Sequence, residues 1–227
     1  GALVKSGTGL IWSGFRPSDD ACTYGYLIPS NMFAVTVLGY LEKIERKIYG
    51  NGEIAEAAKA LKEEVHTAIE TIGKTFTEEF GMVYAYETDG FGMYNLMDDA
   101  NVPSLLAMNY LGYPSDKEVE ANTRRLLLSE ANPFYFKGAK AAGIGSPHTP
   151  SNYIWHIAMA VQGLTTGDRE EKRRILENMA ATTGGKGVMH EGFCCEDDTR
   201  YTREWFSWAN AMYAELFLNY LGYTLDK

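Results

Sequence analysis

Ten residues near the start of the chain concentrate groups that bind or transform polar ligands. In the stretch Trp12–Ala21, an aromatic ring and a guanidinium precede two adjacent carboxylates. Trp12 offers a flat apolar face and Arg16 a planar fork of donors. Because a sugar has an apolar ring face and a rim of hydroxyls, this pairing suits a sugar. Asp19 and Asp20 add acids that are suited to proton transfer.

Pro17 predicts the backbone around these acids. It fixes its own φ and disfavours helical geometry at Arg16. We therefore expect Ser18, Asp19 and Asp20 to cap and begin a helix, whose positive end would hold an acid in a defined position. The alternative is that these residues only cap a helix, since Ser and Asp are common at that position.

A partner carboxylate lies far along the chain, in the Gly-rich loop 184–198. Glycoside hydrolysis needs two carboxyl groups, one protonated and one ionised, on either side of the scissile bond. We expect Glu191 to activate water as a general base, with His190 and Gly192 shaping its loop. The alternative is an exposed loop glutamate without a role.

Two further sets of residues have metal-binding or sugar-binding chemistry. Asp98 and Asp99, in the loop 88–101, can bind sugar hydroxyls or cap a helix that begins near Pro103. His148 and His156 are eight residues apart and lack partners at the helical spacing of metal-binding motifs. We therefore expect no metal site, and hydrogen-bonding or buried roles for these histidines.

The elements that must position these loops are mostly helices. Apolar residues at spacings of three and four predict two long helices, with stripes that include Phe33, Val37, Leu41, Ile44 and Ile48 in the first and Ile54, Ala58, Leu61, Val65, Ile69 and Ile72 in the second. We expect Pro29 to break the run before the first helix, Ser30 to cap that helix, and Gly50-Asn51-Gly52 to end it. The predicted helices are 31–49, 53–80, 104–111, 116–129, 153–164, 169–182 and 203–220, and the best strand is 82–87. The motif Asn-Tyr-Leu-Gly-Tyr occurs at 109–113 and 219–223, where Gly suits the end of a helix. This pattern favours an all-α chain of stacked helical hairpins with a functional face of loops.

Composition excludes several classes of function. The net charge of -9 over 227 residues argues against nucleic acid as a partner. No apolar run is long enough to span a membrane, so we expect no membrane partner. The three cysteines, Cys22, Cys194 and Cys195, have neither disulfide-framework nor zinc spacing, which fits a reducing, cytoplasmic compartment. The chain begins without Met, and we expect a fragment of a longer protein.

The run Ile11–Tyr26 closely resembles the signature of glycoside hydrolase family 125, whose members are exo-acting α-1,6-mannosidases. The resemblance continues in the family's order over nearly the whole chain. The other matching runs are Met97–Leu106, Gly145–Pro150, Tyr153–His156, His190-Glu191 and Tyr201–Asn210.

This resemblance implies an (α/α)6 barrel and an inverting, metal-independent mechanism without a cofactor. The substrate would be an α-mannoside oligosaccharide, such as an N-glycan fragment, that loses terminal mannose. The resemblance implies Glu191 as the base and an acid in Ser18–Asp20; we favour Asp19 and keep Asp20 as the alternative. In an inverting enzyme the two carboxyls lie roughly 6.5–9.5 Å apart. The candidates for substrate binding are Trp12, Arg16, Asp98, Asp99, Asn101, His148, Trp155, His156 and His190.

The chain departs from the family in two ways. Members are roughly twice as long, so residues 1–227 resemble the C-terminal part of a single catalytic domain and would form about half of the ring. Cys194-Cys195 after Phe193 is not expected in the Glu191 loop. Two alternatives stay open, a non-catalytic helical carbohydrate-binding module or incomplete fragment, and an (α/α)-barrel glycosidase of another specificity, such as a glucosidase.

Overall fold

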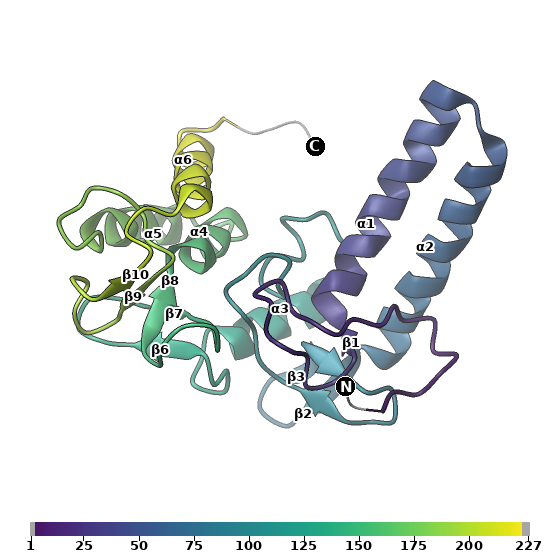
Figure 1. Ribbon diagram of the computed structural model, residues 1–227, viewed down its shortest axis with the longest axis horizontal. Coiled ribbons are helices and arrows are strands. Elements are labelled where there is room, and N and C mark those ends of the chain that lie inside the picture. The colour runs from purple at the N-terminus through teal and green to yellow at the C-terminus, as the bar shows by residue number, and fades with distance from the viewer. Residues whose placement is uncertain (1–2, 224–227) are drawn as a thin grey trace. The chain divides into compact units, whose positions relative to one another are not determined.

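The computed structural model of the chain describes residues 3–223 and is rich in helix (Figure 1). Gly1 and Ala2, where the chain starts without Met, lie outside the described residues, as do residues 224–227 of the predicted domain 1–227. The chain divides into two compact units. The N-terminal unit runs to Leu96 and includes Pro103–Arg125, and the C-terminal unit comprises Met97–Val102 and the chain from Leu126. No helix in residues 3–223 is long and apolar enough to cross a membrane.

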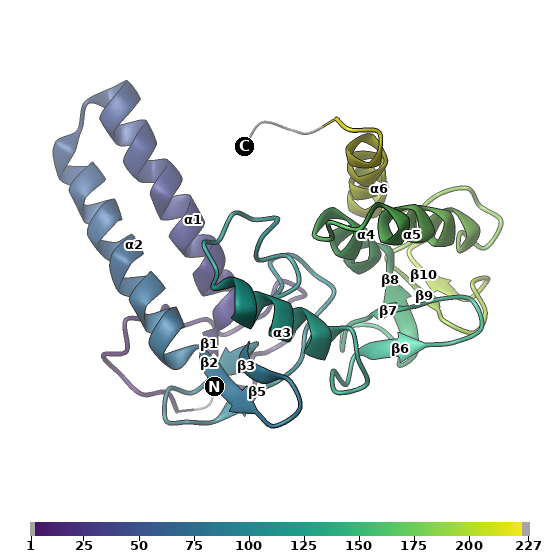
Figure 2. The same ribbon diagram turned by 180° about the vertical axis from the view of Figure 1, so that it is seen from behind.

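A long helical hairpin dominates the N-terminal unit. Helix α1 (Ile28–Ile44) continues into a π-helical turn, η1 (Glu45–Tyr49), and α2 (Gly52–Ile72) returns beside it (Figures 1 and 2). Gly50 has a left-handed φ of 66° between them. The Asn51 side chain caps α2 by accepting from the Ile54 N–H at 3.2 Å. The hairpin and its Gly-Asn-Gly turn confirm the prediction from sequence.

The bounds and the buried face of this hairpin differ from the prediction. Helix α1 begins at Ile28, with Pro29 in its first turn, where a missing N–H costs nothing. Neither the predicted break at Pro29 nor the Ser30 cap is therefore present. Helix α2 ends at Ile72 instead of Phe80. Most of the predicted apolar positions are exposed, namely Phe33, Val37, Leu41, Ile44, Ile48, Ile54 and Leu61.

Short strands complete the N-terminal unit. β2 (Lys74–Thr77) and β3 (Gly81–Tyr84) form a hairpin where the sequence predicted the end of α2. β1 (Tyr26–Leu27), β4 (Glu87–Thr88) and β5 (Tyr94–Asn95) form a sheet in the order β1-β4-β5. Helix α3 (Lys117–Leu127) confirms the prediction for 116–129. The predicted helix 104–111 is instead a series of turns.

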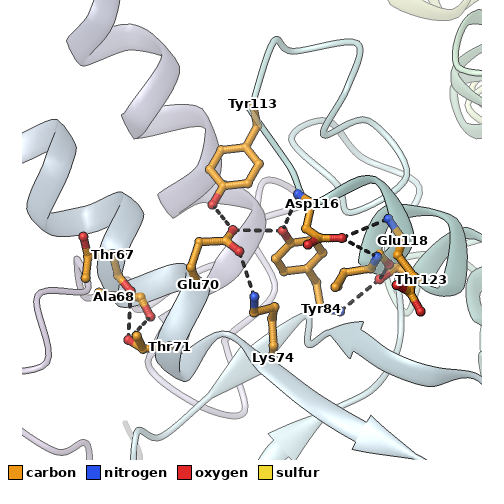
Figure 3. A network of polar contacts seen from close by, with 11 residues as sticks. Thr67, Ala68, Glu70, Thr71, Lys74, Tyr84, Tyr113, Asp116, Glu118 and Thr123 are labelled. Carbon is orange, nitrogen blue, oxygen red and sulfur yellow. Dashed lines mark hydrogen bonds and ion pairs between the residues drawn. The ribbon is translucent and has the colours of Figure 1, made fainter.

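A polar network around Glu70 of α2 holds these elements of the N-terminal unit together (Figure 3). Its carboxylate accepts from the hydroxyls of Tyr84 (2.9 Å) and Tyr113 (2.7 Å) and from Lys74 (2.8 Å). Burial opposes ionisation of Glu70, but these three donors outweigh it and lower the pKa of the carboxyl. Burial and the bond to Glu70 raise the pKa of both tyrosines, so they remain donors.

The C-terminal unit combines three helices with two small sheets. Helices α4 (His156–Leu164), α5 (Arg169–Ala181) and α6 (Ser207–Tyr220) pack on one another, with strands on one side of them (Figures 1 and 2). β6 (Tyr135–Lys137) pairs with β7 (Ala142–Ile144). β8 (Tyr153–Trp155), β9 (Gly192–Cys194) and β10 (Tyr201–Thr202) form a sheet in the order β10-β9-β8.

The prediction of an all-α chain therefore needs a correction. The described residues contain ten strands of two to four residues as well as six α-helices. Such strands are too short to show an alternating pattern, and pairing with distant segments defines them. The repeated Asn-Tyr-Leu-Gly-Tyr motif behaves as expected, because Gly112 and Gly222 both have left-handed φ, of 86° and 93°.

Candidate functional site

The segment that carries Asp19 and Asp20 forms a tight reversal, which we name the acidic loop (Phe15–Ala21). Phe15 and Ala21 pair across it in an antiparallel bridge. The Arg16 N–H donates to the Asp20 carbonyl at 2.8 Å, and the Asp19 N–H donates to the Arg16 carbonyl at 3.0 Å. These bonds close a hairpin loop, so the predicted helix start at Ser18–Asp20 is wrong, and the first helix begins only at Ile28.

Asp19 and Asp20 differ within this loop. Pro17 occupies the second position of the turn, which its fixed φ suits. Asp19 follows with a φ of 68°, the left-handed residue typical of a three-residue hairpin loop. Asp19 is exposed at the tip, whereas Asp20 is half-buried and its Oδ2 is shielded from solvent.

A buried ion pair anchors the acidic loop to β4. Arg16 Nε donates to Glu87 Oε1 at 2.7 Å, and both side chains are buried. Glu87 Oε2 accepts from the Thr23 N–H (3.1 Å), the Tyr24 N–H (3.3 Å) and the Asn95 side chain (3.1 Å). The Glu87 carboxylate therefore binds Arg16 within the acidic loop and the backbone of Thr23 and Tyr24 just after it. Arg16, which the sequence suggested as a sugar ligand, uses its guanidinium in this pair.

In the C-terminal unit, Glu191 lies where the chain enters β9, in what we name the Glu191 segment (His190–Phe193). Three successive backbone N–H groups are held there. The His190 N–H donates to His156 Nδ1 (3.1 Å), the Glu191 N–H to the Thr202 carbonyl (3.2 Å) and the Gly192 N–H to Thr202 Oγ1 (3.1 Å). These anchors restrict the backbone on both sides of the carboxylate.

The Glu191 side chain is 7% exposed and forms an ion pair with Arg203, whose Nε lies 3.1 Å from Oε1. The Arg203 side chain is 62% exposed, so solvent reaches the partner of a carboxylate that is itself nearly covered. Arg203 also has a left-handed φ of 44°, which is uncommon for a long side chain and occurs often at functional sites.

His156 and His190 are fully buried beside Glu191. The His190 ring stacks on Tyr201 at 4.0 Å between centroids, and its Nδ1 donates to the Glu204 carbonyl at 2.5 Å. The His156 ring stacks on Phe193 at 4.7 Å. Burial lowers the pKa of His156 to about 4, so this ring is neutral at neutral pH. Both residues are 0% exposed, and a direct role in binding sugar stays a prediction.

The loop candidates Asp98, Asp99 and Asn101 are also buried. Asp99 accepts from the Asn101 N–H (3.2 Å) and from the Asn101 side chain (3.3 Å), which makes a local turn. The Asp98 N–H donates to the Asn132 side chain at 3.3 Å. The alternative of capping a helix near Pro103 does not apply, because residues 103–112 form bends and turns instead of a helix. Binding of sugar hydroxyls by these residues stays a prediction.

The aromatic candidates fall into two groups. Trp12, in the N-terminal unit, is 57% exposed, and its ring lies against Gly25 so closely that a Cβ added there would clash with Nε1. In the C-terminal unit, His148 is exposed and packs edge-to-face near Trp155, which is buried and donates to Thr149 Oγ1 at 2.9 Å. Trp12 and His148 therefore retain surface for a sugar, whereas Trp155 supports its neighbours.

Sequence reasoning missed the partners of the key charges, Glu87 and Arg203. Glu87 ends an apolar, aromatic run, and an acid at such a position signals a specific buried partner. Arg203 lies in the run Tyr201–Asn210 that carries the family resemblance, but nothing in its neighbours indicated a bond to Glu191.

Two other chemistries find no support in the described residues. No group of three or more His, Cys, Asp or Glu side chains within residues 3–223 is placed to hold a metal ion. The three cysteines are free thiols. Burial, with the nearby Glu87 charge, raises the pKa of Cys22 to about 11, and burial also raises that of Cys195. Neither is activated as a thiolate nucleophile.

The chain matches a known family along most of its length. The family model described as metal-independent alpha-mannosidase (GH125) matches residues 1–218. The meiotically up-regulated gene 157 protein of Schizosaccharomyces pombe is 42% identical over 223 residues, which are 97% of this chain and 44% of that protein.

A solved structure is similar in both sequence and fold. It is that of a metal-independent α-mannosidase from Streptococcus pneumoniae in a non-productive complex with α-1,6-mannobiose. The TM-score is 0.96 at 49% identity, over 99% of this chain and 53% of that one. The chain thus spans about half the length of the proteins that it matches.

Proposed function

Because the chain belongs to the family of metal-independent alpha-mannosidases (GH125), we propose that it supplies catalytic residues to an inverting exo-α-1,6-mannosidase. Such an enzyme removes terminal mannose from α-mannoside oligosaccharides, including fragments of N-glycans. The observation that supports this most strongly is the Glu191 segment, where a nearly covered carboxylate stands on an anchored backbone. A general base must be held in this way to act on one water molecule.

In the proposed reaction, Glu191 accepts a proton from the attacking water. The water oxygen bonds to the anomeric carbon from the face opposite the leaving group. The bond to the glycosidic oxygen breaks, and an Asp of the acidic loop donates a proton to that oxygen. The product is β-mannose, with the configuration inverted. No metal or cofactor takes part in this scheme.

The acid is Asp19 or Asp20. Asp19, the residue favoured from sequence, projects from an exposed, left-handed position at the loop tip. Asp20 is half-buried, and a general acid that must retain its proton is favoured by a less solvated position. We therefore give the two residues equal weight. The variants Asp19→Asn and Asp20→Asn separate them, because only loss of the acid is overcome by a substrate with a good leaving group.

We propose that Trp12 and His148 contact sugar, because each presents exposed ring surface. Trp12 supplies an aromatic face, on which the apolar side of a pyranose packs. The buried candidates in the two units, which include Arg16, Asp99 and Trp155, would then support loops instead of binding sugar directly.

We also propose that the chain forms the C-terminal part of one (α/α)6 catalytic domain, about half of its ring. The share of each relative that is covered, 44% and 53%, supports this. So does the exposed apolar face of α1, which includes Phe33, Val37 and Ile44. In a ring of helical hairpins such a face would pack on a neighbouring hairpin.

The first experiment is hydrolysis of α-1,6-mannobiose, with the anomer of released mannose followed by proton NMR at early times. We expect β-mannose first, and we expect Glu191→Gln to abolish turnover without abolishing binding of the disaccharide. Initial α-mannose would contradict inversion. Binding without turnover in the wild-type protein would favour the non-catalytic module, and hydrolysis of α-glucosides in preference to mannosides would favour a glucosidase.

A further inference from the structure

His156 lies at the junction of β8 and α4, behind the Glu191 segment. It is fully buried, and its ring stacks on Phe193, two residues beyond Glu191. Its Nδ1 lies 3.1 Å from the backbone nitrogen of His190, one residue before Glu191. One imidazole ring therefore contacts the chain on both sides of the proposed base.

The partners of Nε2 determine which nitrogen of His156 carries the proton. Nε2 lies 3.1 Å from Thr182 Oγ1. The Thr182 hydroxyl donates to the Asn178 carbonyl at 2.8 Å, and this bond uses its only proton. Thr182 Oγ1 must therefore accept, and Nε2 of His156 must be the donor.

A neutral imidazole has one ring proton, so Nδ1 of His156 carries a lone pair. Burial keeps the ring neutral, because it lowers the pKa to about 4. The His190 N–H can only donate, and Nδ1 is the acceptor that it meets. The His190 carbonyl also lies 3.2 Å from Nδ1, but a bond to it would need a proton there. The contacts of Nδ1 and those of Nε2 therefore indicate the same tautomer of His156, with the proton on Nε2.

We propose that His156 is a positioning residue for the general base. Its Nδ1 lone pair holds the His190 N–H, and its ring supports Phe193, so that the Glu191 carboxylate is presented in one orientation. Hydrogen bonds link this orientation to α5, running from Asn178 through Thr182 and His156 to His190. This inference rests on the proposed role of Glu191 and adds a residue that acts through the backbone without touching the sugar.

Two amide variants of the full-length protein separate this role from simple packing. The Oδ1 of Asn reaches the position of Nδ1, so His156→Asn keeps an acceptor for the His190 N–H. The Nε2 of Gln reaches the position of the imidazole Nε2, so His156→Gln keeps the bond to Thr182 and loses that acceptor. We expect His156→Gln to lower kcat for α-1,6-mannobiose about 100-fold with KM little changed. We expect His156→Asn to stay near the wild-type kcat.

Amide exchange at His190 provides a readout that does not depend on turnover. It should accelerate in His156→Gln and remain slow in His156→Asn. If the two variants lose activity equally, or in proportion to stability, His156 serves only packing and the proposal fails. A wild-type protein that hydrolyses no mannoside would overturn the proposed function instead, while exchange would still test how His190 is held.

Should His156→Gln not fold, Thr182→Val gives a second test against Thr182→Ser. Val removes the acceptor that fixes the proton on Nε2, whereas Ser retains it. We expect Thr182→Val to lower kcat more than Thr182→Ser, again with KM unchanged. Equal kcat values would contradict the assigned tautomer.

Discussion

An arginine–glutamate pair accompanies the proposed catalytic residues of each unit, and the two pairs differ in burial. Arg16 and Glu87 are 6% and 0% exposed in their side chains, so the whole pair is covered by protein. Arg203 is 62% exposed while its partner Glu191 is 7% exposed. The same two residue types therefore form a buried ion pair that joins two segments in one unit and a solvent-accessible ion pair in the other.

The comparison shows that the contacts of a buried carboxylate distinguish a stabilising role from a chemical one. A carboxylate with four donors, as in Glu87, is satisfied and has no lone pair in reach of water. Glu191 has one charged partner that solvent reaches, and its position comes instead from neutral bonds to the backbone. A carboxylate held in this second way can still accept a proton from water.

Breaking the buried pair should give the largest effect on stability. We expect Glu87→Ala to lower the free energy of unfolding by about 3–5 kcal/mol, because it removes one member of a buried ion pair and the acceptor of four hydrogen bonds. Urea denaturation of the purified protein measures this. Activity should fall as well, since the acidic loop loses its anchor.

A double variant provides the control for this prediction. Arg16→Met/Glu87→Gln removes both charges and keeps an acceptor for the backbone N–H groups of Thr23 and Tyr24. It should be more stable than Glu87→Ala, because both charges of the pair are removed together and an acceptor is kept. If Glu87→Ala has the same urea midpoint as the wild-type protein, the Arg16–Glu87 pair does not stabilise the fold as its geometry indicates.

The neutral anchor of the Glu191 segment predicts a dependence of stability on pH. The His156 pKa falls from 6.5 to about 4 on burial, so the unfolded chain binds a proton that the folded chain does not. The stability due to this group is complete above pH 6.5 and is lost as pH falls toward 4, by roughly 3 kcal/mol.

Urea midpoints for the wild-type protein and His156→Asn, compared at neutral pH and near the lower pKa, test this prediction. The difference between the proteins isolates His156 from other acids. We expect the wild-type protein to lose more stability than the variant on acidification. Parallel pH curves for the two proteins would rule out a buried, neutral His156.

Asp19 allows the backbone of the acidic loop to be tested apart from its carboxyl group. At a φ of 68°, Ala is strained and Gly is not. We therefore expect Asp19→Ala to be about 1 kcal/mol less stable than Asp19→Gly. Asp19→Asn should retain stability, since Asn tolerates this conformation. Equal urea midpoints for Ala and Gly would show that the loop does not constrain this residue.

Sequence alone predicted the features that are set by neighbouring residues. Gly50 and Asn51 mark the turn between α1 and α2, because a left-handed residue and a cap are local requirements. The two copies of Asn-Tyr-Leu-Gly-Tyr place Gly112 and Gly222 in the same conformation for the same reason. The family resemblance added the class of enzyme, which periodicity could not provide.

Features set by distant residues were not predictable in this way. The Arg16–Glu87 bond joins residues 71 positions apart, and no residue near Arg16 in the sequence indicates it. The pairing of Leu27 with Glu87 defines strands of two residues each, too short to read from a pattern. The exposed face of α1 violates the rule that apolar stripes are buried within the chain itself.

The accessible pair gives the smallest effect on stability and therefore the sharpest test of the comparison. We expect Arg203→Met to lower the free energy of unfolding by about 1 kcal/mol, because the guanidinium that is lost is exposed to solvent, although its partner Glu191 is nearly covered. Turnover of α-1,6-mannobiose should fall much further than stability, since Glu191 loses its charged partner. Arg173→Met, which removes exposed pairs with Glu170 and Glu177 on α5, is the matched control and should change neither quantity appreciably. If Arg203→Met instead destabilises the protein as strongly as Glu87→Ala, both pairs are structural ties and the distinction between them is wrong.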